Sequence, residues 1–289
     1  MSISEKLGDQ RTVDLPQGRV TYRETGSGEA IVFVHGVLVN GDLWRDVVAE
    51  LSTRYRCITP DWPLGAHPEP MSADADLSTP GLGRLVADFL AALSLDDVTL
   101  VGNDTGGAVC QMVITRHPER VARLVLASCD AYEVFPPQPF GFLRWIGRVP
   151  PLMALLAHSV RLRPLRRLPL AFGLVTSGPL PREISDSYVT PGYRASIRRD
   201  TRKVLNGVSN EHTLEAARHF GEVTQPVLVA WGEDDKLFPA KLADRLAADF
   251  PDARRETVTG SRTFIGEDQP QQLAQLIDRF VAETPIASG

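Results

Sequence analysis

Hydrophobic residues follow two patterns along this chain, one typical of buried strands and one typical of amphipathic helices. The continuous apolar run at residues 30–36 is typical of a strand buried on both faces of a sheet, and further strands are expected at 96–102 and 226–232. Residues 78–95 instead repeat apolar side chains at three- and four-residue spacing, which predicts an amphipathic helix. Strands that alternate with such helices predict a mostly parallel, doubly wound sheet with helices on both faces.

The same reading assigns the remaining elements. Pro16 and Gly18 supply the turn of an edge hairpin within residues 11–30, and Asp42 is the predicted N-cap of a helix that reaches Leu51. Further strands are expected at 55–61, 121–130 and 253–260, and further helices at 106–119, 240–250 and 269–283.

The alternation stops between residues 134 and 225. This stretch has clustered prolines, apolar helical runs and no clear strand, so it predicts a mainly helical insertion, called the cap below. The expected domains are a core in two parts, residues 1–133 and 226–289, with the cap at 134–225. No internal repeat is evident.

Composition and charge narrow the class of protein. With 289 residues, 43% hydrophobic, the chain is long enough for one sizeable core. A net charge of −5 and no basic motif argue against nucleic acid as a partner. Cys57, Cys110 and Cys129 lack metal-ligand or paired spacing and predict buried free thiols. No segment has the length and hydrophobicity for membrane insertion, so a soluble, cytoplasmic protein is expected, and a homodimer stays open.

The strongest chemical signal is the stretch GNDTGG at residues 102–107. It joins a buried strand to a helix, and its glycines permit a strained turn that exposes the central side chain, Asp104, beside a helix N-terminus. Taken alone, the five-residue pattern also fits an ordinary helix start after a strand.

Four further segments accompany this turn in a fixed order. They are HG at 35–36, RHPERVARLVL at 116–126, WGEDDKLFP at 231–239 and FIGEDQP at 264–270. Together with the aspartate at the turn, the chain resembles the α/β-hydrolase superfamily, in the branch of haloalkane dehalogenases and epoxide hydrolases. The resemblance covers residues 20–283, and the cap matches in position and helical character only.

The resemblance implies a role for each matching position. Asp104 stands where the nucleophile forms an alkyl-enzyme ester, and the backbone N–H groups of Val37 and Thr105 stand at the oxyanion hole. Asp235 matches the acid that orients the base. Asp130 lies at the other strand end from which some relatives draw that acid, although a helix cap or turn is the plainer reading.

The base itself is missing. The family histidine would immediately precede FIGED, and Thr263 stands there, unable to accept a proton near neutral pH. His67 and His158 could approach the site by location alone. The halide-binding side chains of dehalogenases are absent at Val37 and Thr105, which disfavours dehalogenation.

Three functions therefore stay open. Hydrolysis of an epoxide, ester or carbon–halogen bond is the family default. Asp104 with Asp235 could instead form an acid–base pair for isomerisation, elimination or cyclisation, because two close carboxylates cannot both ionise easily. A ligand-binding protein with a degenerate triad is the third. Tyr188 and Tyr193 are candidates for proton donors in epoxide opening, although ordinary cap tyrosines fit as well.

The cap adds two features. Apolar residues, Phe135, Phe140, Phe142, Trp145 and Leu152, predict an apolar pocket over Asp104 or the cap's own core, and hence a small apolar organic substrate. Residues 161–170, RLRPLRRLPL, form a basic amphipathic run that suits a membrane surface, an anionic group or a plain solvated face. Nothing in the sequence calls for a metal or an organic cofactor.

Overall fold

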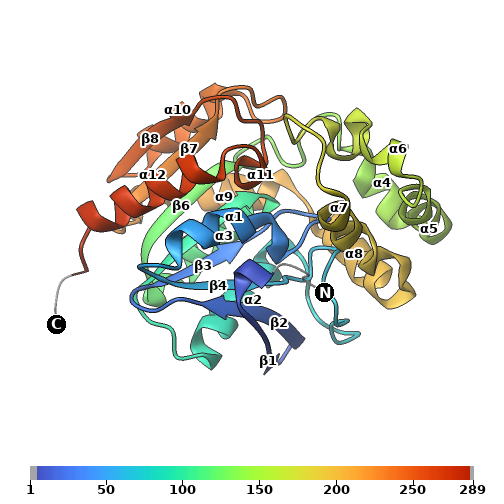
Figure 1. The fold of residues 1–289 in the computed structure, drawn as a ribbon, viewed down its shortest axis with the longest axis horizontal. Helices are drawn as coiled ribbons and strands as arrows, with labels where there is room; N and C mark the ends of the chain where they lie inside the picture. Colours follow the sequence, from blue (N-terminus) through green and yellow to red (C-terminus); the bar gives the residue numbers. More distant parts are fainter. Residues whose placement is uncertain (1–4, 287–289) are drawn as a thin grey trace.

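A computed structural model describes residues 5–286 and contains one eight-stranded sheet (Figure 1). The strand order is β1-β2-β4-β3-β5-β6-β7-β8; β2 is antiparallel to β1 and β4, and the other neighbours are parallel. The strands are β1 Asp9–Leu15, β2 Gly18–Thr25, β3 Ala30–Val34, β4 Arg56–Pro60, β5 Val98–Asp104, β6 Val121–Cys129, β7 Val227–Gly232 and β8 Ala253–Val258.

Helices cover both faces of this sheet. The α-helices are α1 Arg45–Leu51, α2 Thr79–Ala92, α3 Thr105–Arg116, α4 Phe142–Arg148, α5 Pro150–Ser159, α6 Arg163–Arg166, α7 Arg182–Val189, α8 Ala195–Gly207, α9 Asn210–Ala217, α10 Ala240–Asp249, α11 Ile265–Asp268 and α12 Pro270–Glu283. Shorter helical turns are η1 Glu5–Leu7, η2 Gly41–Trp44, η3 Pro118–Arg120, η4 Pro169–Gly173, η5 Pro191–Tyr193 and η6 Phe220–Glu222. Helix α1 packs on α12, and α3 packs on α2 and α9.

The central strands are buried on both faces because they carry continuous apolar runs. Every residue of β5 and β7 is buried, as is nearly all of β3 and β6. Strands β3 and β5 are neighbours, yet the chain leaves β3 towards β4 and leaves β5 towards β6. Such a switch point opens a crevice at the carboxyl ends of the strands, where ligands bind in sheets of this type.

Most predicted elements are present, with one correction. The helix expected to begin at Asp42 instead starts with the 3₁₀ turn η2, whose N-cap is Asn40: the Asn40 side chain accepts a hydrogen bond from Asp42 N at 3.0 Å. Asn40 and Asp42 are both good capping residues, so the sequence alone could not separate them. Helix α2 begins after Ser78, whose side chain caps it by accepting a hydrogen bond from Gly81 N.

Between β6 and β7 the described chain contains helices α4 to α9 and no strand. Figure 1 shows α4, α5 and α6 together at the side of the molecule away from β7 and β8. The boundaries of the cap at 134 and 225 stay our interpretation. Cys57, Cys110 and Cys129 are buried free thiols, as predicted.

Candidate functional site

Asp104 occupies a strained turn at the end of β5. Its φ of 54° and ψ of −132° are unfavourable for a residue with a Cβ. In this backbone conformation the Asp104 side chain projects from the end of the strand towards the pocket. The flanking glycines make the turn possible. A Cβ at Gly106 would lie 2.2 Å from Val34 O, so only glycine lets α3 begin this close to β3.

Two backbone amides point at the Asp104 carboxylate. Val37 N lies 3.3 Å from Asp104 Oδ2, and the N–H of Thr105 also donates to this carboxylate. Gly36 fits beneath the same oxygen, since a Cβ there would lie 2.2 Å from Asp104 Oδ2. The Asp104 carboxylate is therefore held by two amides, one from the segment after β3 and one from the first residue of α3.

His35 has a structural place beside this turn. Trp62 N donates to His35 Nε2 at 2.8 Å, so Nδ1 carries the proton and donates to Gly36 O at 2.9 Å. Burial lowers the pKa of His35 to about 3, which keeps the ring neutral. The histidine thus fixes the backbone that presents Val37.

The side chains of Asp235, which follows β7, and Thr263, which follows β8, are in contact. Thr263 Oγ1 donates to Asp235 Oδ1 at 2.9 Å, and the amides of Leu237 and Phe238 donate to the same oxygen at 2.8 and 3.0 Å. Asp235 Oδ2 is buried and has no hydrogen-bond partner within residues 5–286. Burial raises the pKa of Asp235, and these donors oppose the rise.

Asn103 ties this region to the strained turn. Its Nδ2 donates to Thr263 O at 2.7 Å and to Ala127 O, also at 2.7 Å, at the end of β6. Sequence reasoning gave Asn103 no role beyond its place in GNDTGG. The position of Asn103 next to the predicted strained turn was the sequence feature that could have indicated a structural role.

Asp130 is the third buried carboxyl of the site. Thr105 Oγ1 donates to its Oδ2 at 3.2 Å, whereas its Oδ1 has no partner in the described chain. Burial, followed by the charge of Asp104, raises the pKa of Asp130 well above its usual range. The Asp130 carboxyl is therefore expected to stay protonated near neutral pH.

The pKa of Asp104 is raised as well, to about 7. Burial is the largest cause; the amides of Thr105 and Val37 oppose it, and the charge of Asp235 adds to it. Near neutral pH, Asp104 can therefore exist both as a carboxylate and as an acid.

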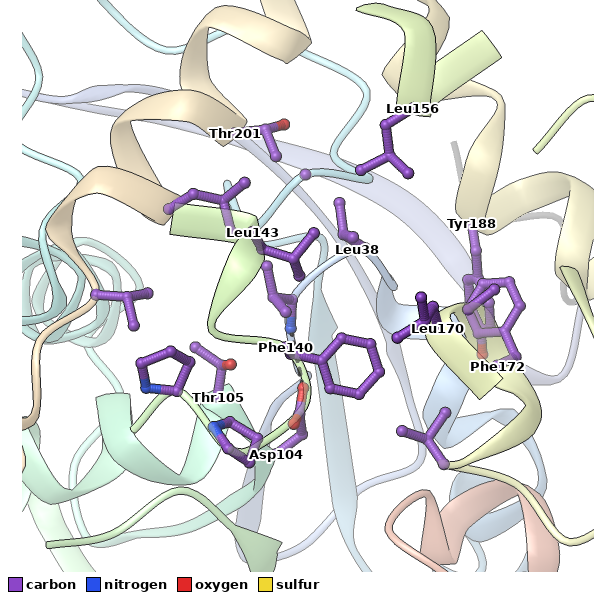
Figure 2. Close-up of a pocket in the computed structure, with 18 of the residues that line it drawn as sticks. Leu38, Asp104, Thr105, Phe140, Leu143, Leu156, Leu170, Phe172, Tyr188 and Thr201 are labelled. Atoms are coloured by element: carbon purple, nitrogen blue, oxygen red, sulfur yellow. Dashed lines mark hydrogen bonds between the residues drawn. The ribbon is translucent and has the colours of Figure 1, made fainter. Parts of the chain in front are cut away.

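A mostly apolar pocket of about 160 Å³ opens above Asp104 (Figure 2). Figure 2 shows Asp104 and Thr105 at one end, Phe140 beside them, and Leu156 and Thr201 at the other end. The lining comes from the strand ends and from the cap. Its members include Val37, Leu38, Asp130, Phe135, Phe140, Leu143, Arg144, Leu156, Leu170, Phe172, Tyr188 and Phe264.

The structure does not bring every candidate to this pocket. His67 is buried elsewhere, with Nε2 3.4 Å from Asp200 Oδ2, and Asp200 was not singled out from the sequence. His158 stacks on Tyr193 with ring centroids 5.7 Å apart, and neither lines the pocket. No histidine within residues 5–286 is among the lining residues.

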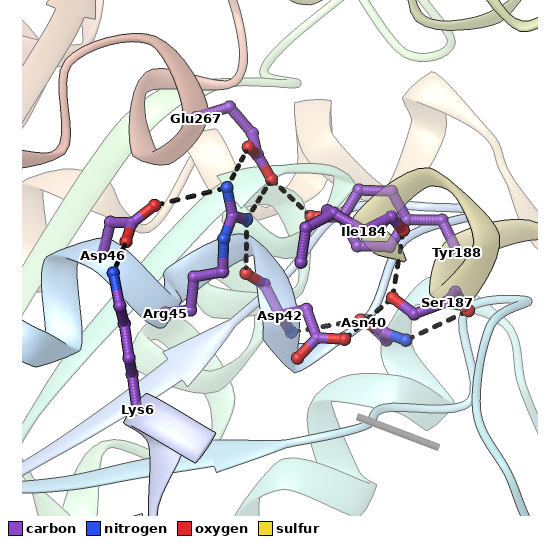
Figure 3. Close-up of polar contacts among 9 residues, drawn as sticks. All are labelled: Lys6, Asn40, Asp42, Arg45, Asp46, Ile184, Ser187, Tyr188 and Glu267. Atoms are coloured by element: carbon purple, nitrogen blue, oxygen red, sulfur yellow. Dashed lines mark hydrogen bonds and ion pairs between the residues drawn. The ribbon is translucent and has the colours of Figure 1, made fainter. Parts of the chain in front are cut away.

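Tyr188 reaches the pocket, but its hydroxyl points to the core. Tyr188 OH donates to Glu267 Oε1 at 2.6 Å, and Arg45 binds both oxygens of Glu267 at 2.7 and 2.8 Å (Figure 3). Burial and the Glu267 charge raise the pKa of Tyr188 well above its usual value. Sequence reasoning missed Glu267, because GED at 266–268 reads as a helix start.

A second contact joins α7 to the core beside Tyr188. Ser187 Oγ donates to Asp42 Oδ2 at 2.8 Å, and Asn40 Nδ2 donates to Ser187 O at 3.3 Å (Figure 3). Helix α7 is therefore fixed to the core at two adjacent residues. No group of three His, Cys, Asp or Glu side chains in residues 5–286 could hold a metal ion.

Residues 29–270 match the model of the alpha/beta hydrolase fold family, and the chain belongs to that family. It is 28% identical to haloalkane dehalogenase 2 of Mycobacterium tuberculosis, over 94% of this chain and 95% of that protein. It is also 23% identical to a cis-3-alkyl-4-alkyloxetan-2-one decarboxylase of Shewanella oneidensis, over 92% and 86% of the two chains.

A solved structure shares the fold. Epoxide hydrolase CorEH superposes with a TM-score of 0.80 at 21% identity, covering 96% of this chain and 99% of that one. The eight-stranded sheet, the helices on both faces and the related enzymes define a hydrolase-like protein with haloalkane dehalogenase and epoxide hydrolase neighbours.

Proposed function

We propose that this chain is an enzyme that converts a small, largely apolar organic molecule, with Asp104 as the reacting group. The observation that carries the proposal is the Asp104 carboxylate at the end of an apolar pocket, with Oδ2 3.3 Å from Val37 N. The amides of Val37 and Thr105 orient the carboxylate, and Oδ1, the oxygen that Val37 does not contact, would attack a substrate carbon. They also match the place where negative charge would develop when the resulting ester is cleaved.

Hydrolysis through an ester is the first candidate. Asp104 Oδ1 would bond to carbon while the bond to the leaving group breaks, and the leaving group would depart with the electron pair. Water would then attack the ester carbonyl carbon, and the Val37 and Thr105 amides would stabilise the charge on Oδ2. Collapse of this intermediate would break the Cγ–Oδ1 bond, so that the product alcohol leaves with that oxygen and the oxygen of water stays in the Asp104 carboxylate. This second step needs a base for the proton of the water.

Thr263 cannot serve as that base near neutral pH. Its hydroxyl donates a hydrogen bond to Asp235. Thr263 therefore orients the Asp235 carboxyl group but cannot take the proton of the attacking water as an imidazole would. Asp235 Oδ2, which lacks a partner within residues 5–286, is the remaining acceptor near this position. We expect a carboxylate in that role to cleave the ester slowly, so the ester would accumulate.

The substrate class follows from the rest of the pocket. Val37 and Thr105 offer no side-chain N–H to a departing halide, which disfavours carbon–halogen bonds despite the similarity to a haloalkane dehalogenase. Tyr188 is bound to Glu267, so it is poorly placed to protonate an opening epoxide. Activated esters, including strained cyclic ones, need neither group and are the substrates we would test first.

Acid–base catalysis is the second candidate. Asp104, with a pKa raised to about 7, shares the site with Asp130, whose Oδ1 has no partner in the described chain. A carboxylate and a carboxylic acid at one pocket suit proton transfer without a covalent ester. The relative from Shewanella oneidensis is named a decarboxylase rather than a hydrolase, which supports testing a non-hydrolytic reaction.

Intact-protein mass spectrometry tests the proposal. Wild type and Asp104→Asn would be incubated with a panel of lactones, esters, epoxides and haloalkanes, and products assayed in parallel. An adduct on wild type alone would support the covalent route with slow ester cleavage. A product with label from ¹⁸O-water and no adduct would support fast hydrolysis.

Two further outcomes decide against the covalent route. A product that carries no label after many turnovers and forms without an adduct would support acid–base catalysis, and Asp130→Asn should then lower its rate about 100-fold or more. Saturable binding with neither adduct nor product, across the panel, would contradict the proposed enzyme activity and indicate a ligand-binding protein.

A further inference from the structure

The exposed large apolar side chains lie together in the cap. Among residues 5–286 they all fall between positions 145 and 170, led by Trp145, Leu155 and Leu162 at 69%, 67% and 65% exposure. They belong to α4, α5, the turns around α6 and the start of η4. The prediction that Trp145 and Leu152 belong to the pocket or to the cap's own core is wrong, because both are exposed and neither lines the pocket, whereas Phe142 packs against a small apolar cluster of the cap.

The same segment is strongly basic. Residues 134–181 contain six arginines and no aspartate or glutamate, in a chain whose net charge is −5. Arg148, Arg161, Arg163 and Arg167 are exposed beside the apolar side chains. A surface that combines tryptophan, leucine and arginine in this way is typical of segments that lie at a lipid–water boundary.

A basic groove of about 420 Å³ borders this surface between α6 and α7. Five arginines line it: Arg163, Arg166, Arg167, Arg182 and Arg262. Asp186 pairs with three of them, Arg163 at 2.9 Å, Arg166 at 2.5 Å and Arg182 at 3.8 Å. The hydrogen bond from Arg166 lowers the pKa of Asp186. One carboxylate among these arginines leaves an excess of positive charge facing the groove.

We propose that residues 145–170, called the docking face below, bind an anionic phospholipid surface. The exposed tryptophan and leucines enter the boundary between headgroups and acyl chains, and the arginines contact lipid phosphates. Charge decides against a second copy of this chain as the occupant. A two-fold dimer through this face would bring two arginine groups together, and like charges at an interface are unfavourable.

The pocket touches the docking face. Leu170 is 55% exposed and also lines the pocket, beside Phe172, which lines both the pocket and the basic groove. An apolar molecule dissolved in the lipid could therefore reach the pocket along this wall. This last step rests on the proposed function, whereas the lipid contact itself does not. No helix in the described chain is long and apolar enough to cross a membrane.

The chain contains its own probe for the contact. Trp44, Trp62 and Trp231 are buried in the core, so Trp145 is the tryptophan that lipid would reach. The full-length protein would be mixed with vesicles of phosphatidylcholine, with and without phosphatidylglycerol. We expect it to float with the phosphatidylglycerol vesicles, a blue shift of its fluorescence, and quenching by brominated lipid that Trp145→Leu abolishes.

Matched variants separate charge from apolar insertion. Arg148→Gln with Arg167→Gln should weaken vesicle binding about tenfold or more, because each arginine near an anionic surface contributes. Leu155→Asn with Leu162→Asn should weaken it at any salt concentration. Arg218→Gln, an exposed arginine at the end of α9 and outside the docking face, is the control and should bind like wild type.

Three results would overturn the proposal. Absence of flotation with phosphatidylglycerol vesicles would remove it, and so would equal binding to both vesicle types that the arginine variant leaves unchanged. A dimer whose formation shifts the Trp145 fluorescence without lipid would assign the docking face to a second copy. Far-UV circular dichroism of each variant would confirm that the fold is intact, and none of these readouts depends on turnover.

Discussion

Thr263 Oγ1 lies 2.9 Å from Asp235 Oδ1 and donates a hydrogen bond to it. Two backbone amides, those of Leu237 and Phe238, donate to the same oxygen. In the site proposed above, Thr263 would therefore take the place of the family histidine beside Asp235. No histidine of residues 5–286 lines the pocket, so the proposed reaction depends on how protons are transferred without an imidazole.

Thr263→His should restore a base beside Asp235. If the ester route operates, the variant should cleave its ester about 100-fold faster or more, because a positioned histidine contributes at least that much. The measurement is the decay of the mass-shifted adduct after removal of substrate. An adduct that persists unchanged in a folded variant would argue against Asp235 as the partner of a base.

Thr263→Val is the matched control for that experiment. It removes the hydroxyl and keeps the side-chain volume, so Asp235 Oδ1 would retain the two amide donors. We expect about 1 kcal/mol of lost stability in urea unfolding and no faster ester decay. Faster decay in Thr263→Val would show that the hydroxyl, rather than a missing base, limits the reaction.

Asp104→Asn should stabilise the protein at high pH. The folded-state pKa of Asp104 is raised from 3.8 to about 7. Between these values the folded state keeps a proton that the unfolded chain releases, so the free energy of unfolding falls as pH rises and levels off above 7. The stability gain of Asp104→Asn should grow to about 3 to 4 kcal/mol.

Urea unfolding of the two proteins at about pH 4 and about pH 8 measures this difference, and near pH 4 the two should be similar. A gain that is the same at both pH values would mean that the carboxyl titrates alike in the folded and unfolded chains.

Gly36→Ala should disrupt the amide contact to Asp104. The added Cβ would lie 2.2 Å from Asp104 Oδ2, so the carboxylate or the Val37 turn must move. Loss of one such donor typically lowers kcat about 100- to 1,000-fold. Gly221→Ala is the control, because nothing lies within 4 Å of its Cβ position. Equal activity of the Gly36→Ala and Gly221→Ala variants would show that the Val37 and Thr105 amides do not contribute to the reaction.

Tyr188→Phe tests the tyrosine as a proton donor. Its hydroxyl already donates to Glu267, so we expect a stability loss of about 1.5 to 3 kcal/mol and kcat within a few-fold of wild type. Product assays with the best substrate from the panel supply kcat and KM. A fall in kcat of about 100-fold at constant KM would instead assign proton donation to Tyr188.

The central strands could be predicted from the sequence because β3, β6 and β7 are mostly apolar, and the hairpin of β1 and β2 could be predicted because its turn contains Pro16 and Gly18. GNDTGG predicted the strained turn at Asp104 since few other residue types permit such a backbone. By contrast, the partner of Tyr188 could not be found, because Glu267 lies 79 residues away and an acidic helix start has a simpler local reading.

Cap residues were predicted less well for a related reason. The helical repeat identifies an apolar face, but it does not say whether that face meets the pocket or solvent. Phe140 lines the pocket and Trp145 is exposed, although both belong to the same apolar run. The distinction depends on how α4 packs on α8 and α5, which is a tertiary property.

The Asn103 amide, which bonds to Thr263 O, joins two parts of the site that are otherwise built on separate backbone. Asp104, Val37 and Thr105 depend on β3, β5 and α3, whereas Asp235 and Thr263 depend on the segments after β7 and β8. Under the function proposed above, a substitution at position 263 would change the contact to Asp235 on one segment, whereas the turn at Asp104 is built on another and keeps its own hydrogen bonds. Residues 259–264 are therefore the segment to vary when new activities are selected.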